Sequence, residues 1–76
     1  MENSFGTKVA AVQTSKAIEV HLKKDVVYKG EKFVGISKYL IEKEVYVGGV
    51  QIPVAKFHEF VQACVALDAE LGGAIQ

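Results

Sequence analysis

The sequence predicts an α+β fold, a curved antiparallel sheet of three to four strands followed by one C-terminal helix. Apolar and polar residues alternate in residues 18–28 and 32–41, the two-residue period typical of strands. Helical spacing of apolar residues then runs from Pro53 to Leu71. The segments between these elements are short, which favours hairpin connections between antiparallel strands.

The second predicted strand spans residues 18–28, after a first strand at residues 7–13. Its alternation predicts a solvent-exposed face that includes His21. The doubled lysine at positions 23–24 breaks this alternation and predicts a β-bulge. Lys29-Gly30-Glu31 is expected to form a hairpin turn, because glycine adopts positive φ readily.

The third predicted strand, residues 32–41, has two different faces. The face expected to form the core carries Val34, Ile36, Lys38 and Leu40, with Lys38 reaching solvent at the end of the strand. A charged turn at residues 42–44 leads into the final strand, residues 45–52. Gly48-Gly49 interrupts that strand and permits a bulge, a sharp bend or a close backbone approach.

The predicted helix carries more apolar surface than one sheet needs. Pro53 suits its first turn, and Gly72-Gly73 is expected to end it. Its apolar residues span an arc of about 160°, whereas a stripe of about 100° suffices against one sheet. The surplus predicts a two-fold homodimer. The alternative is a single wide core under a curved sheet. Residues expected at the dimer interface are Phe57, Phe60, Val61, Cys64, Val65 and Leu67.

The length of 76 residues leaves room for one domain, expected over residues 7–76 after a flexible tail at residues 1–6. The lone cysteine, Cys64, excludes an intramolecular disulfide, and its place on an apolar helix face predicts a buried, reduced thiol. A reducing, cytoplasmic location is therefore expected. No apolar run approaches the roughly 18 residues of a membrane span, so we expect no membrane association.

Charge is balanced overall but divided along the chain. Residues 7–38 contain seven lysines and three acids, a net charge of +4, whereas residues 39–76 contain two lysines and five acids, a net charge of −3. Glu2 supplies the remaining −1. This division favours a basic strand surface, although a mixed, solvated surface is the simpler interpretation. Because the chain has no arginine, bidentate recognition of guanine by arginine is excluded, and lysine contacts with phosphate are favoured.

Residue types common in catalytic and metal sites are present without the spacing that such sites need. His21 and His58 lie on separate predicted elements, and neither is spaced from Cys64 as a metal ligand would be. Gly48-Gly49 is too short for a phosphate-cradling loop. We therefore expect no enzymatic activity, no bound metal and no cofactor.

Four short motifs occur in an order that resembles a known family. They are Tyr28-Lys29-Gly30, Ile36-Ser37-Lys38-Tyr39, Gly49-Val50-Gln51-Ile52 and Phe57. They resemble, in turn, the aromatic-Lys-Gly turn, the Ile-Arg-Glu-Tyr strand, the Gly-Ile-Ser-Leu strand and the helix aromatic of the positive-cofactor-four family. These proteins are transcriptional coactivators with bacterial and phage relatives. The resemblance covers residues 18–67.

The resemblance implies a homodimer formed through the C-terminal helix that binds single-stranded DNA across its sheets, in transcription, replication or recombination. Lysines on strands attract phosphate without sequence preference, and exposed aromatic residues stack on bases. The chain departs from the family at Ser37, which replaces an arginine, at Val47-Gly48, which replace basic residues, and at Glu31. The residues expected to contact nucleic acid are Lys23, Tyr28, Lys29, Lys32, Lys38, Tyr39 and Tyr46.

A second function fits the same sequence. Zero net charge, the lack of arginine and the surplus apolar surface are also compatible with a small dimeric module that binds a protein, for example at an open sheet edge. Single-stranded DNA and RNA are not distinguished, since no residue is committed to a 2′-hydroxyl contact. For a nucleic-acid binder the expected location is the nucleoid, or the host cytoplasm if the protein is encoded by a phage.

Overall fold

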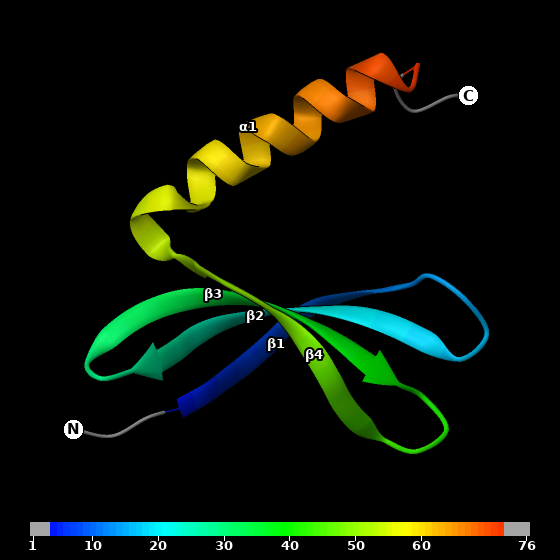
Figure 1. Cartoon of the computed structure of the whole chain (residues 1–76), viewed down its shortest axis with the longest axis vertical. Helices are drawn as coiled ribbons and strands as arrows, with labels where there is room; N and C mark the ends of the chain where they lie inside the picture. Colours follow the sequence, from blue (N-terminus) through cyan, green and yellow to red (C-terminus); the bar gives the residue numbers. More distant parts are fainter. Residues whose placement is uncertain (1–3, 73–76) are drawn as a thin grey trace.

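A computed structural model describes residues 4–72 as four antiparallel strands followed by one helix (Figure 1). The strands lie in the order β1-β2-β3-β4, so each pairs only with its neighbours in the chain and both outer strands leave an open edge. The predicted α+β class and element order are confirmed. The elements are β1 (Ser4–Gln13), β2 (Ile18–Tyr28), β3 (Glu31–Leu40), β4 (Val45–Pro53) and α1 (Val54–Glu70).

Strand β1 begins at Ser4, three residues before the predicted start at Thr7. Residues 1–3 of the predicted tail lie outside the described residues, and so does Gly73 of the predicted helix end. Lys29 and Gly30 join β2 to β3 with φ of 53° and 81°, the positive values at both central residues that a type I′ turn requires. The predicted hairpin turn is therefore confirmed.

The predicted bulge in β2 is present. Lys23 pairs with Gly35 and Val26 pairs with Phe33, so two residues of β2, Lys24 and Asp25, lie opposite the single residue Val34. Asp25 has a φ of 58°, which matches the irregular backbone of a bulge. The extra residue shifts the alternation, so that Val26 points to the same side of the sheet as Lys23.

The predicted irregularity at Gly48-Gly49 is also present. Ser37 pairs with Gly49 and Tyr39 pairs with Tyr46, so β4 carries one extra residue at this point. Gly49 has a φ of 157°, and a Cβ atom built on it would lie 2.2 Å from the carbonyl oxygen of Ile36. Only glycine fits this approach between β3 and β4 without a backbone shift.

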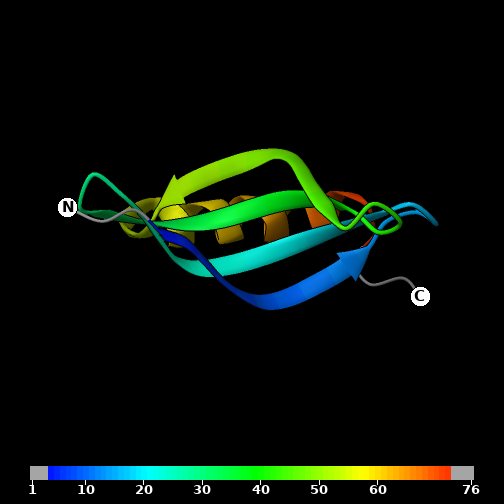
Figure 2. The same cartoon turned by 90° about the horizontal axis from the view of Figure 1, so that it is seen from below.

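The register gives the sheet two chemically different faces. One face, called here the aliphatic face, lies under α1, which passes behind the sheet in Figure 2. The other, called here the aromatic face, points away from the helix and carries all five aromatic residues of the strands. The aliphatic face contains Val20, Leu22, Val34, Ile36 and Ile52, and the aromatic face contains Phe5, Tyr28, Phe33, Tyr39 and Tyr46.

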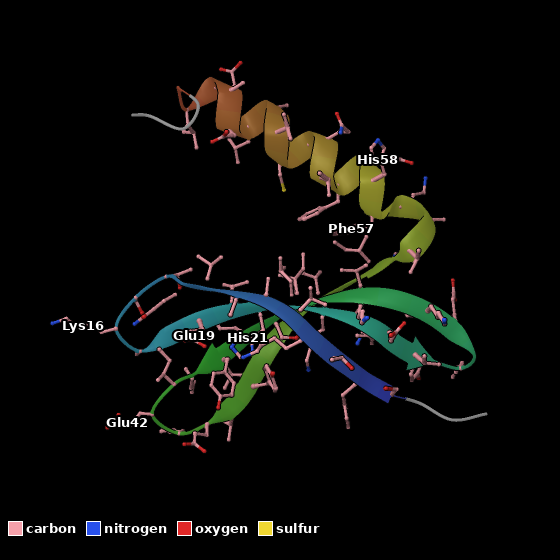
Figure 3. All side chains as sticks on the ribbon, turned by 180° about the vertical axis from the view of Figure 1, so that it is seen from behind. Lys16, Glu19, His21, Glu42, Phe57 and His58 are labelled. Atoms are coloured by element: carbon pink, nitrogen blue, oxygen red, sulfur yellow. The ribbon has the colours of Figure 1, made fainter. Side chains whose placement is uncertain are left out.

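Helix α1 is only loosely covered by the sheet, and none of its residues is buried. Phe57 points toward the sheet and His58 points away from it (Figure 3). A hollow of about 400 Å³ separates Leu22 and Ile36 from the helix side chains. Cys64 is exposed in the single chain, so the expected burial of its thiol is not found there. Within residues 4–72, no helix is long and apolar enough to cross a membrane.

We predict that Gly49→Ala destabilises the fold by more than about 2 kcal/mol, because the new methyl group would meet the backbone of β3. Chemical denaturation at one fixed protein concentration measures the loss. Gly48→Ala is the matched control, since a Cβ there meets no atom within 4 Å and only its φ of 141° is unfavourable. Equal losses in the two variants would show that the close approach at Gly49 contributes nothing.

Candidate nucleic-acid interface

The aromatic face is organised in rows that cross the four strands. In one row His21 is flanked by three small residues, Ala11 on β1, Ser37 on β3 and, beyond it, Gly49 on β4. The neighbouring row contains Gln13, Glu19, Tyr39 and Tyr46. The small side chains leave space above the sheet, and the two tyrosine rings lean over the imidazole to fill it.

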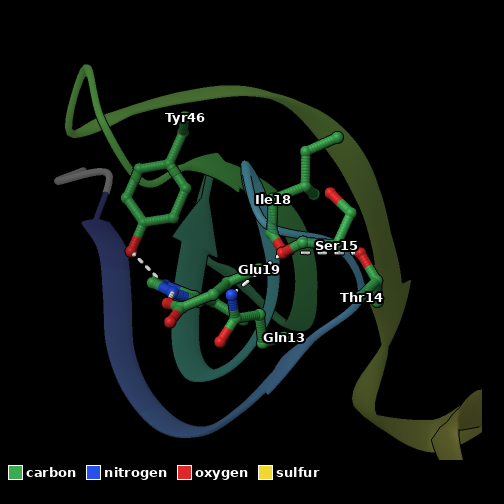
Figure 4. A network of polar contacts seen from close by, with 7 residues as sticks. Gln13, Thr14, Ser15, Ile18, Glu19 and Tyr46 are labelled. Atoms are coloured by element: carbon green, nitrogen blue, oxygen red, sulfur yellow. Dashed lines mark hydrogen bonds and ion pairs between the residues drawn. The ribbon is translucent and has the colours of Figure 1, made fainter.

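His21 is held by polar contacts on both ring nitrogens. Its Nε2 lies 2.8 Å from Glu19 Oε1, and its Nδ1 lies 3.0 Å from the Tyr46 hydroxyl (Figure 4). In the neutral tautomer that fits both contacts, Nε2–H donates to Glu19 and Nδ1 accepts from the tyrosine. The ring also stacks on Tyr39 at 4.6 Å between centroids and meets Tyr46 edge-on at 5.4 Å. The cluster therefore fixes the positions of both tyrosine rings.

The predicted solvent exposure of His21 is wrong, since only 3% of the residue is exposed. The alternation placed it correctly on the face away from the aliphatic residues. It is buried because Tyr39 and Tyr46, which are distant in sequence, close over it. No signal in the local sequence of β2 reports this packing.

The Tyr39 phenol lies in a partly apolar and acidic surrounding. Its removal from water raises its pKa above the usual value, and the negative charges of Glu44 and Glu19, together with Tyr46, raise it further.

Basic side chains border the tyrosines. The Lys23 ammonium lies 4.0 Å from the centroid of the Tyr46 ring, a cation–π distance. Lys8 on β1 pairs directly with Lys23 across the strands and so shares the aromatic face. Lys8 is absent from the predicted site residues. The face on which Lys8 lies follows only from the register between β1 and β2, which includes a bulge between Lys8 and Ala10.

Tyr28 and Lys29 form the tip of the β2–β3 hairpin. Tyr28 is 50% exposed, and the Lys29 ammonium lies 5.4 Å from its ring centroid. The alternation places Tyr28 on the aromatic face together with Val26. The structure therefore groups four predicted contact residues with this face and its tip: Lys23, Tyr28, Tyr39 and Tyr46, with Lys29 beside them at the turn.

Lys32 and Lys38 are not grouped with the others. Both belong to the alternate set of β3 that includes Val34 and Ile36, and Lys38 borders a hollow together with Val20 and Ile36. They lie on the aliphatic side of the sheet. A nucleic acid that follows the aromatic face would pass them only at the margins of the sheet.

A hollow of about 730 Å³ opens on the aromatic face beside the tyrosine cluster. Gly35, Ser37 and Gly49 are among its lining residues, so part of it is lined by bare or nearly bare backbone. Phe5, Lys23, Tyr46 and Gln51 also line it. An aromatic wall, a cation and an amide around a hollow of this size are suited to a planar polar ligand.

Within the described range 4–72, no three histidine, cysteine, aspartate or glutamate side chains gather as metal ligands would. Comparisons with protein-family models, with curated proteins and with solved structures find no match to this chain. The chemistry of the aromatic face is therefore the basis for a functional proposal.

We predict that His21→Ala lowers the free energy of unfolding by about 2–3 kcal/mol, because it removes a buried ring together with its two hydrogen bonds and its contacts with both tyrosines. Tyr46→Phe should cost about 1 kcal/mol, since only one hydrogen bond is lost. Chemical denaturation measures both values. His58→Ala, on the outer side of the helix, serves as the control with a change within about 0.5 kcal/mol. A loss of that small size for His21→Ala would contradict the described cluster.

Proposed function

We propose that this chain is a homodimeric protein that binds single-stranded nucleic acid, DNA first, with little sequence preference, inside the cell. The observation that carries the proposal is the segregation of side chains between the two faces of the sheet. All five strand aromatics lie on one face, together with Lys8 and Lys23, while the opposite face carries the aliphatic residues together with Lys32 and Lys38. The motif resemblance to the positive-cofactor-four family supports the same assignment.

Stacking and charge act together on the aromatic face. Three of its rings are well exposed: Phe5 at 89%, Tyr28 at 50% and Tyr46 at 45%. Each exposed ring offers a base about 1–3 kcal/mol of stacking energy without regard to its identity. The nearby lysines attract phosphate in the same manner, since counterion release depends on charge and not on sequence. Duplex DNA keeps its bases stacked on one another, so it gains the attraction between lysine and phosphate without the stacking on aromatic rings.

The dimer is supported by apolar surface that the single chain leaves in water. Phe60 is 39% exposed, Val65 is 56% exposed and Leu67 is 59% exposed, all on the helix arc predicted to form an interface. Each Å² of such surface removed from water contributes about 25 cal/mol. A second copy that packs its helix against this one would cover that arc. It would also bury Cys64, as its position on the arc predicts.

A protein-binding module is the second candidate, and one observation favours it. Strand β1 has an open edge with exposed apolar residues, Val9 at 64% and Val12 at 60%. An extended segment of a partner would pair with this edge by adding a strand. This function needs neither the aromatic face nor the lysines, so loss-of-charge variants separate it from nucleic-acid binding.

We predict that labelled oligo-dT of about 20 nucleotides binds more tightly than a duplex of equal length in fluorescence anisotropy at low salt, and that binding weakens steeply as salt rises. Lys8→Ala combined with Lys23→Ala should weaken binding about tenfold and reduce the slope of log affinity against log salt by about 1.4, because two phosphate contacts are lost.

The matched control is Lys32→Ala combined with Lys38→Ala, which removes the same charge from the other side of the sheet. A larger effect in this control would move the binding site to the aliphatic side. Absence of binding to either oligonucleotide at tens of micromolar protein would leave the protein-binding module as the preferred function. Equal binding to a single-stranded RNA would show that the ligand includes RNA as well as DNA, and the aromatic face would remain the proposed site.

We predict that the chain sediments as a dimer in analytical ultracentrifugation and that Val65→Asp shifts it to monomer, since an unpaired buried charge is costly. Ala66→Asp is the control, because its position lies roughly 180° around the helix from the centre of the apolar arc. Oxidative cross-linking through Cys64 gives an independent readout. A wild-type monomer at high micromolar concentration would exclude this dimer.

A further inference from the structure

The hollow on the aromatic face has a composition that a flat stacking surface does not need. Tyr46 borders it near Lys23, and Phe5 borders it from β1. Between these side chains lies Gly35, which pairs with Lys23 on one side and with Gln51 on the other and adds no side chain to the hollow. A planar ring would enter this space between two aromatic side chains.

The two glycines of the hollow are closely approached by their neighbours, Gly35 by the Val26 and Lys23 side chains of the same face and Gly49 by the backbone of β3. A Cβ atom on Gly35 would lie 3.1 Å from Cγ2 of Val26, and a Cβ atom on Gly49 would meet the backbone of Ile36 and Ser37. Gly35 is buried, although Lys23 and Gln51 on either side of it are not. The register of β2, β3 and β4 therefore fixes where the two positions without a side chain lie in the hollow.

The wall of the hollow is held in advance of binding. The Tyr46 hydroxyl is bonded to His21 Nδ1 at 3.0 Å, the Tyr39 ring lies 5.1 Å from the Tyr46 ring, and Lys23 lies over its face. A ring with its hydroxyl and one face already in contact loses little freedom when a ligand stacks beside it. Such preorganisation increases affinity, because less freedom is lost on binding.

Gln51 supplies the polar group that distinguishes one ring from another. It lines the hollow, and its partner in the pairing of β3 and β4 is Gly35, which has no side chain to engage the amide. A glutamine amide presents one donor and one acceptor in a plane. Adenine offers the complementary pair, the N6 amino group and N7, and glutamine binds it in bidentate fashion.

We propose that the hollow is a subsite for one unstacked adenine base per subunit, with Tyr46 as the stacking wall and Gln51 as the specificity-determining residue. This inference rests on the proposed single-strand binding and deepens it, because one nucleotide of an otherwise sequence-tolerant ligand would be recognised by its edge. The ligand is a nucleobase within a strand, whose phosphates are held by Lys8 and Lys23.

The test compares four oligonucleotides of equal length, oligo-dA, oligo-dC, oligo-dT and an abasic chain, in fluorescence anisotropy at one salt concentration. The wild-type protein should bind oligo-dA at least about fivefold more tightly than either pyrimidine chain, and the abasic chain most weakly. Gln51→Ala should reduce the preference for oligo-dA to less than about twofold and leave affinity for the abasic chain unchanged.

Gln62→Ala, which removes an exposed amide from the helix, is the matched control and should keep the preference. Equal binding of the three base-bearing chains to wild-type protein, or a preference that survives Gln51→Ala, would overturn the subsite while the proposed single-strand binding stands. Failure to bind any of the four chains would overturn both. Because Gln51 is exposed, its replacement should leave the fold intact, which circular dichroism checks.

Discussion

The direction in which the side chains point depends on three places where one strand carries an extra residue against its neighbour. These places are Val9 in β1, the pair Lys24 and Asp25 in β2, and the segment before Gly49 in β4. Each insertion reverses the alternation beyond it. Strict alternation from Ala11, His21 and Gly49 would put Lys8, Val26 and Tyr46 on the aliphatic side. The bulges gather them on the aromatic face, and the histidine cluster and the hollow exist only because of that.

The elements follow from the sequence because each has a local cause: alternation in the strands, Lys29-Gly30 in the turn, and the helical spacing after Pro53. Two bulges were also predictable, from the doubled lysine and the doubled glycine. Which residues these bulges bring to the aromatic face was not predictable, because the face on which Tyr46 lies depends on its pairing with Tyr39 in another strand. The burial of His21 requires four strands in register, and Lys8 is assigned to the site only once β1 is aligned with β2. Pairing between strands depends on residues that are distant in sequence, and the alternation of apolar and polar residues within one strand does not predict it.

The two faces of the sheet separate two roles that compete for apolar residues in a small protein, forming a core and offering an exposed aromatic surface. A chain of this size buries only about 60% of its unfolded surface, so much of its apolar surface stays outside a core. Here the helix and the aliphatic face keep most of these residues, and the aromatic residues of the strands are left on the opposite side. Apart from backbone at Gly35, the most buried residues, Val26 and His21, belong to the aromatic face, where the sheet closes around them. The aromatic face thus has buried residues of its own without a second layer above it.

The strand order β1-β2-β3-β4 has a consequence for the time at which this chain acquires its structure. Every strand pairs with the one synthesised just before or after it, so the sheet contains only short-range closures and can form early, as low contact order favours. The helix leaves the ribosome after all four strands. Until it does, the aliphatic face of a nascent sheet is open to solvent, flanked by two unpaired edges that invite association with other chains. The interval between the synthesis of β4 and of α1 is therefore the period in which this protein is most exposed to aggregation and most in need of a chaperone.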